Sequence, residues 1–167
     1  MRGNKLMSVR PDGTGLRTVR SFSTGTYDPS WAPGGGRIAV THFDGSDNKF
    51  HVFTVKPDGT GLERVANTGG CTHPDWSPNG VRFTFTCQTA ASVSDVYVAH
   101  TDGTSKKRVT NTPNVREFAP TWSPNHARLL YWIIENGALY TIRPDGTGRT
   151  KVRAVMAQSV HSSWQPR

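Results

Sequence analysis

The sequence predicts an all-β protein built from repeated four-stranded antiparallel units, because two interleaved motifs share one period. One motif is a short apolar segment that ends in Asp-Gly-Thr, with its aspartates at Asp12, Asp58, Asp102 and Asp145. The other is a tryptophan followed two residues later by proline, at Trp31, Trp76, Trp122 and Trp164. The aspartates are 46, 44 and 43 residues apart and the tryptophans 45, 46 and 42, so both motifs mark the same repeat.

A period of about 40–45 residues that contains four short strands is typical of a β-propeller blade. With the strands named a to d from the propeller axis outward, residues 1–167 form a single propeller domain. Three complete blades are expected at about 29–66, 74–109 and 120–152. A partial fourth blade takes strands c and d from 1–20 and strand a from 162–167. Its missing strand b leaves open ends, through which we expect self-association or completion by a larger propeller.

Each blade element has a local physical reason. Apolar residues alternate in the third strands, as at Phe53 and Val55, which places one face of the strand against a neighbouring blade. The Pro-Asp-Gly-Thr-Gly stretch is turn chemistry and joins strands c and d. The tryptophan motif turns strand a into strand b, and we expect its indole to pack between blades.

Composition agrees with short strands and turns, since the chain has 17 glycines, 11 prolines and no sustained helical periodicity. No apolar run is long enough to cross a bilayer, and the first ten residues show no secretory signal. The net charge of +8 suggests a polyanion as a partner. The basic residues are dispersed along the chain, however, and the tightest cluster is Lys106-Lys107-Arg108. A solvated surface is therefore the favoured interpretation, and we expect no nucleic-acid partner.

The longer d–a and b–c loops all point to one end of the propeller, and this end is the expected partner surface. Its candidate binding residues are Tyr27, Asp28, His42, Phe43, His73, Arg116, Glu117, Phe118, Glu135 and His161. The alternative is that they are ordinary solvated loop residues.

Metal and cysteine chemistry give weaker signals. Asp28, His73 and His161 precede strand a in successive blades, but no metal-ligand spacing accompanies them, so no metal or cofactor is expected. The stretch 44–48 resembles the start of a calcium loop without its later ligands, and a b–c turn is predicted. Cys71 and Cys87 flank one a–b hairpin, where they either pair as a disulfide or remain thiols.

Catalytic motifs are missing from the sequence. It contains no Gly-x-Ser-x-Gly elbow, phosphate-binding loop or His-Glu-x-x-His, and four of its 12 carboxylates belong to the repeated turn. We therefore expect no catalytic residues.

The Pro-x-Trp-Ser-Pro-x-Gly motif, followed by an apolar strand and then an aromatic-rich strand ending in Asp-Gly-Thr-Gly, resembles the TolB-like (WD-repeat-like) propeller repeat. The resemblance covers nearly the whole chain, although Gly34, Asn79 and Asn125 replace the family's usual aspartate and Ser162 replaces its proline.

This resemblance implies a non-catalytic scaffold of the bacterial periplasm or cell envelope that binds protein partners. Two alternatives stay open. One is the gating propeller of a prolyl-oligopeptidase-type serine peptidase whose catalytic domain is absent, and the other is a basic polyanion-binding module.

Overall fold

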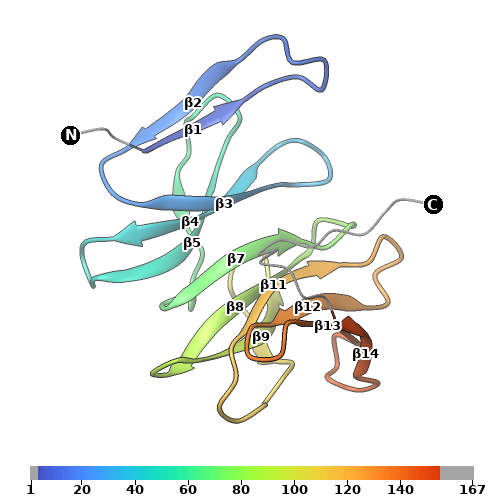
Figure 1. The fold of residues 1–167 in the computed structure, drawn as a ribbon. Coiled ribbons are helices and arrows are strands. Elements are labelled where there is room, and N and C mark those ends of the chain that lie inside the picture. Colours follow the sequence, from blue (N-terminus) through green and yellow to red (C-terminus); the bar gives the residue numbers. More distant parts are fainter. Residues whose placement is uncertain (1–3, 155–167) are drawn as a thin grey trace.

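The computed structural model describes residues 4–154, and every regular element in that range is a β-strand (Figure 1). An N-terminal strand pair consists of β1 (Asn4–Ser8) and β2 (Arg17–Phe22). The first blade contains β3 (Thr26–Trp31), β4 (Ile38–Asp44), β5 (Lys49–Val55) and β6 (Glu63–Arg64). The second contains β7 (Cys71–Trp76), β8 (Arg82–Ala90), β9 (Val93–His100) and β10 (Lys107–Arg108). The third contains β11 (Glu117–Trp122), β12 (Leu129–Ile133), β13 (Ala138–Ile142) and β14 (Thr150–Ala154).

Each blade is a separate four-stranded antiparallel sheet in which consecutive strands are neighbours. The first strands of the blades, β3, β7 and β11, lie side by side, and the sheets fan out from them (Figure 1). The prediction of an all-β fold of four-stranded antiparallel sheets is confirmed. The strand expected at 162–167, with Trp164, lies outside the described residues, and no helix within 4–154 could cross a membrane.

The hydrophobic core is divided into layers between adjacent sheets, as expected when each sheet buries a face against its neighbour. One layer joins Ala39 and Val52 of the first blade to Phe83 and Phe85 of the second. A similar layer joins the second blade to the third, and another joins the N-terminal pair to the first blade. Every blade therefore depends on the sheet before it.

The Asp-Gly-Thr turns share one hydrogen-bond pattern. In the turn after β5, the Asp58 carboxylate accepts bonds from the Thr60 backbone N–H (2.9 Å) and hydroxyl (2.7 Å), and the other three turns repeat it. Gly59 follows with φ +85°, and a Cβ there would collide with the backbone oxygen of Val19. Glycine is required because the turn both takes a left-handed conformation and presses against the preceding sheet.

The first strand of each blade begins about three residues earlier than predicted. Pro29, Pro74 and Pro120 were expected to start these strands, but each lies inside its strand, where the pairing register shifts. The bulge interrupts the ladder at that point, so proline removes no paired N–H. The residue before each proline takes a positive φ: 54° at Asp28, 55° at His73 and 47° at Ala119.

The tryptophans were expected to pack between blades, and this expectation is wrong for Trp31. Trp76 and Trp122 are buried, whereas Trp31 is 50% exposed. Trp76 lies against the preceding blade, and its Nε1 donates to the Ser30 carbonyl oxygen of β3 (3.1 Å). The sheet that precedes the first blade has only two strands, β1 and β2, within the described residues, whereas a complete four-stranded blade precedes Trp76.

One position of the a–b pairing carries a different pair in each blade. In the second blade Cys71 lies opposite Cys87, and the two form a disulfide. The matching pairs are Thr26 with His42 in the first blade and Glu117 with Ile133 in the third.

Candidate functional site

Two adjoining hollows of about 350 and 360 Å³ open at the end of the blades that carries the b–c turns and d–a loops. They share Phe50, Thr72 and Phe118, so they form one continuous depression across the inner strands. We call it the aromatic groove. It is lined by Tyr27, Asp28, Thr41, Phe43, Asn48, Lys49, Phe50, Gly70, Thr72, His73, Thr86, Gln88, Ser92, Val93, Ser94, Arg116 and Phe118.

The apolar part of the groove is a row of rings from the first blade. Phe43 and Phe50 are opposite each other in the β4–β5 pairing, with ring centroids 5.3 Å apart at an edge-to-face angle. Tyr27 of β3 lies 6.1 Å from Phe50 and is 54% exposed. Rings held by rigid strands give contact area at little entropic cost, which suits a binding surface.

The floor of the groove is a hydrogen-bonded chain between the first and second blades. The Asp28 carboxylate accepts from the Thr41 hydroxyl (3.0 Å) and pairs with His73 Nε2 (3.4 Å). The His73 backbone N–H donates to the Thr41 hydroxyl (3.0 Å), and its ring packs on Phe118 of the third blade at 4.0 Å. Positive φ at Asp28 and His73 aims both side chains at this junction. The inner strands of three blades thus meet in one preorganised floor.

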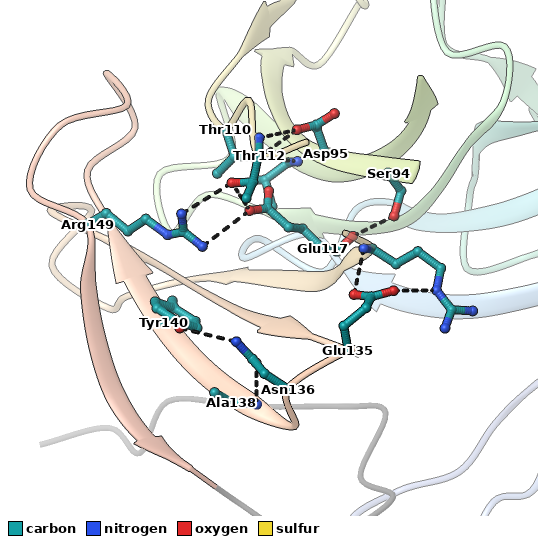
Figure 2. A network of polar contacts seen from close by, with 12 residues as sticks. Ser94, Asp95, Thr110, Thr112, Glu117, Glu135, Asn136, Ala138, Tyr140 and Arg149 are labelled. Atoms are coloured by element: carbon teal, nitrogen blue, oxygen red, sulfur yellow. Dashed lines mark hydrogen bonds and ion pairs between the residues drawn. The ribbon is translucent and has the colours of Figure 1, made fainter. Parts of the chain in front are cut away.

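Arg116 forms the far wall of the groove, and contacts with a carboxylate of the third blade hold its side chain in place. Its Nε and backbone N–H donate to the two carboxylate oxygens of Glu135, at 2.9 and 2.8 Å (Figure 2). Burial raises the pKa of Glu135, but these bonds outweigh it and leave that pKa below its ordinary value. Glu135 therefore orients Arg116 and lies behind it.

Glu117 was expected on the exposed loop, and the structure corrects this. Its side chain is fully buried and its Oε1 accepts from the Thr112 hydroxyl (2.9 Å), with Arg149 at 3.7 Å (Figure 2). Burial raises the pKa of this carboxyl. Glu117 starts β11 in the position that Cys71 takes in the second blade, so alternation turns it inward.

His42 is also outside the groove. It packs between Phe22 (4.7 Å) and Phe53 (5.2 Å), and its Nδ1 contacts the Thr26 hydroxyl at 2.8 Å. Burial lowers the pKa of His42. The remaining candidate, His161, lies outside the described residues. The groove therefore brings together six predicted residues: Tyr27, Asp28, Phe43, His73, Arg116 and Phe118.

Sequence reasoning missed Phe50 and Lys49, which begin β5 beside the groove. A signal was present, because a hairpin centred on 45–48 pairs Phe43 with Phe50 and places both rings on one face.

The 44–48 turn gathers possible metal ligands but already holds a cation. Ligand atoms of Asp44, Asp47 and His51 lie within 4.8 Å of one another. The Arg64 guanidinium lies 3.1 Å from Asp44 and 4.0 Å from Asp47, and His51 Nε2 bonds Asp47 at 2.8 Å. These contacts give both carboxylates of the b–c turn a hydrogen-bonding or cationic partner, so the turn does not require a metal ion to balance their charge.

Comparison with known proteins finds TolB proteins both by sequence and by structure. No protein-family model matches the chain. It is 26% identical over 155 residues to a protein named TolB homolog from Chlorobium luteolum, covering 90% of this chain and 32% of that protein. TolB from Acinetobacter baumannii superposes with a TM-score of 0.75 at 19% identity, over 88% of this chain and 37% of that one. The fold is that of a TolB-like propeller.

Structures of hydrolases also resemble this fold. A puromycin hydrolase structure superposes with a TM-score of 0.64 at 18% identity, over 88% of this chain and 27% of that one. The chain spans about a third of the length of the Chlorobium luteolum and Acinetobacter baumannii TolB proteins. At these sequence identities the likeness to solved structures shows the fold alone, and the function is inferred from the aromatic groove.

Proposed function

We propose that this TolB-like array is a non-catalytic scaffold that binds an extended segment of a partner protein in the aromatic groove. The observation that carries the proposal is the groove itself, in which one exposed and two half-buried rings line one side and fixed hydrogen-bonding groups line the other. Such a mixture fits recognition of a peptide, whose side chains need apolar contacts while its backbone needs hydrogen bonds.

The compartment in this proposal is the periplasm or cell envelope of a bacterium. The TolB homolog supports it by resemblance, and the Cys71–Cys87 disulfide supports it by chemistry, because disulfides persist in oxidising compartments.

Dispersed ion pairs weigh against the polyanion alternative. Arg37, Arg64 and Arg108 each pair with a carboxylate of their own blade, so these three guanidinium groups are already engaged, and the remaining basic residues are dispersed along the chain.

The test is site-specific cross-linking in the source bacterium. A photoreactive residue replaces Ser92 in the groove, and we expect an adduct with one partner protein. Tyr27→Ser should abolish this adduct, whereas Val81→Ser should leave it unchanged, since Val81 is similarly exposed (51%) but lies in the a–b turn of the second blade, outside the groove. An adduct that survives Tyr27→Ser equally well would contradict the proposal.

A peptidase-gating propeller is the second candidate, favoured by the likeness to puromycin hydrolase. A hydrolase domain with a Gly-x-Ser-x-Gly elbow in the same reading frame would support it, and a reading frame without one would exclude it.

A further inference from the structure

An arginine stands six residues after each blade tryptophan, and two of these three arginines are tied into their own sheets. Arg37 donates from Nε to the Thr54 hydroxyl (2.9 Å) and from a terminal nitrogen to the Gly61 carbonyl (2.8 Å). Arg128 repeats the arrangement with the Thr141 hydroxyl (3.1 Å) and the Gly148 carbonyl (2.6 Å). Each arginine thus clamps its c–d turn to its second strand.

The second blade breaks this pattern. The threonine that precedes the turn aspartate by four residues is replaced by Val98, and the glycine that follows it by three is replaced by Ser105. Valine offers no hydroxyl, so the clamp has lost an acceptor. Within residues 4–154 the Arg82 guanidinium makes no hydrogen bond or ion pair.

Arg82 instead lines a hollow of about 420 Å³ at the boundary of the second and third blades. Lys107 of β10, His100 and Arg143 line the same hollow, and Val98 and Ala127 supply apolar wall. Its lining combines residues of the a–b and c–d turns with the strand ends beside them, so it opens at the end of the blades opposite the aromatic groove.

The only acidic residue in this lining, Asp145, makes no ion pair with these cations. Its carboxylate accepts from the Thr147 backbone N–H (2.8 Å) and hydroxyl (2.7 Å). These bonds lower its pKa, and the charges of Arg143 and Lys107 contribute to the lowered pKa. Lys107 Nζ reaches only the Asp145 backbone carbonyl, at 3.0 Å. Arg143 makes one long bond to the Thr147 hydroxyl (3.4 Å), which leaves most of its donors available.

We propose that Arg82, Lys107 and Arg143 bind a phosphate monoester in this hollow. Three cations from two blades converge on one space, and guanidinium groups match phosphate oxygens in bidentate geometry. The hollow is of the size that holds small organic molecules, and its apolar wall suits the organic part of an ester. A soluble ester and a phospholipid headgroup share this chemistry.

The test is calorimetric titration of the 167-residue chain at about 0.15 M salt, where dispersed surface charge is largely screened. Glycerol 3-phosphate is the soluble probe, vesicles containing phosphatidic acid present the same group on a lipid, and inorganic phosphate is the ion alone. Saturable binding of either ester supports the site. The ester that binds more tightly identifies the ligand as a soluble phosphate ester or as a lipid headgroup. Binding of none, or of inorganic phosphate as tightly as both esters, overturns it.

Two variants localise the binding. Arg82→Gln should weaken ester binding about tenfold or more, the effect of losing charge-assisted bonds, and the matched Arg37→Gln should not weaken it. Val98→Thr restores the missing hydroxyl and should draw Arg82 into its own sheet, weakening binding with no change in net charge. Unchanged affinity in Arg82→Gln, or equal loss in Arg37→Gln, overturns the proposal even if Val98→Thr fails to fold.

Discussion

Trp31 and Trp76 come from the same motif, yet one is 50% exposed and the other is 9% exposed. Trp76 packs on Phe83 at 4.3 Å and donates to the backbone of the preceding blade, whereas Trp31 meets a sheet of only two described strands. The difference indicates that a blade by itself does not complete the burial of its tryptophan. Burial comes from the neighbour, as expected for a repeat protein whose stability resides in interfaces between units.

The largest expected effect tests this comparison directly. Trp76→Ala should lower the free energy of unfolding by about 3–5 kcal/mol, because it removes a buried ring from the layer between blades. Trp31→Ala should cost less than about 1 kcal/mol, since half of that ring already contacts water. Urea unfolding followed by circular dichroism measures both, and equal losses would show that the two tryptophans have the same role.

Asp75 sharpens the comparison, because it links the inner strands of all three blades. Its carboxylate accepts from Ser30 of the first blade (3.1 Å) and from the Thr121 hydroxyl (2.8 Å) and Trp122 backbone N–H (2.9 Å) of the third. Asp75→Ala should cost about 2–3 kcal/mol by removing the acceptor of these three hydrogen bonds, one of them from the backbone of buried Trp122. Asp75→Asn keeps one acceptor oxygen and should cost less.

Asp75 should also shape the pH dependence of stability. Burial raises its pKa, and the hydrogen bonds from Trp122, Thr121 and Ser30 oppose that shift without cancelling it. With a raised pKa, its contribution to stability is fully present below the unfolded-state value and declines as pH rises through the folded-state value. Asp75→Asn should remove this decline in unfolding measured from pH 3 to 7, and an unchanged profile would contradict the assignment.

The turn aspartates give the smallest effect, with the opposite sign. Hydrogen bonds from the Thr60 backbone N–H and then its hydroxyl lower the pKa of exposed Asp58 below its ordinary value of 3.8. Its contribution is present above that value and lost as pH falls through the folded-state pKa. Asp58→Asn should therefore reduce acid destabilisation between about pH 5 and 2, where the ordinary aspartate pKa lies. Thermal melts of both proteins at each pH measure it, and equal slopes would contradict it.

The sequence predicted the strands well and the ends of the inner strands poorly. Hydrophobic alternation and turn residues located the second and third strands of each blade. The blades were predicted to start at about 29, 74 and 120, the positions of three prolines, and the bulges that accommodate these prolines inside the strands left no separate sequence signal. Glu117 was consequently predicted in a loop, although it pairs with Ile133 and is buried.

The binding end was predicted from blade geometry, whereas the groove itself was not. Knowing which loops share an end placed Tyr27, His73 and Phe118 on one surface. Their convergence depends on the positive φ of residues such as His73 and on how closely adjacent blades approach. Neither quantity is encoded in a pattern of single residues.

The sequence by itself determined the repeat, the order of strands within a blade and the chemistry of each turn. These features depend on contacts among residues a few positions apart, and they recur with every copy of the motif. The tertiary structure alone decided that Trp31 is exposed whereas Trp76 is buried, because these residues share one motif and differ only in the sheet that precedes them. It also decided that the Asp75 carboxylate reaches both neighbouring blades and that Arg82 lines a hollow, since such contacts depend on how closely adjacent sheets approach.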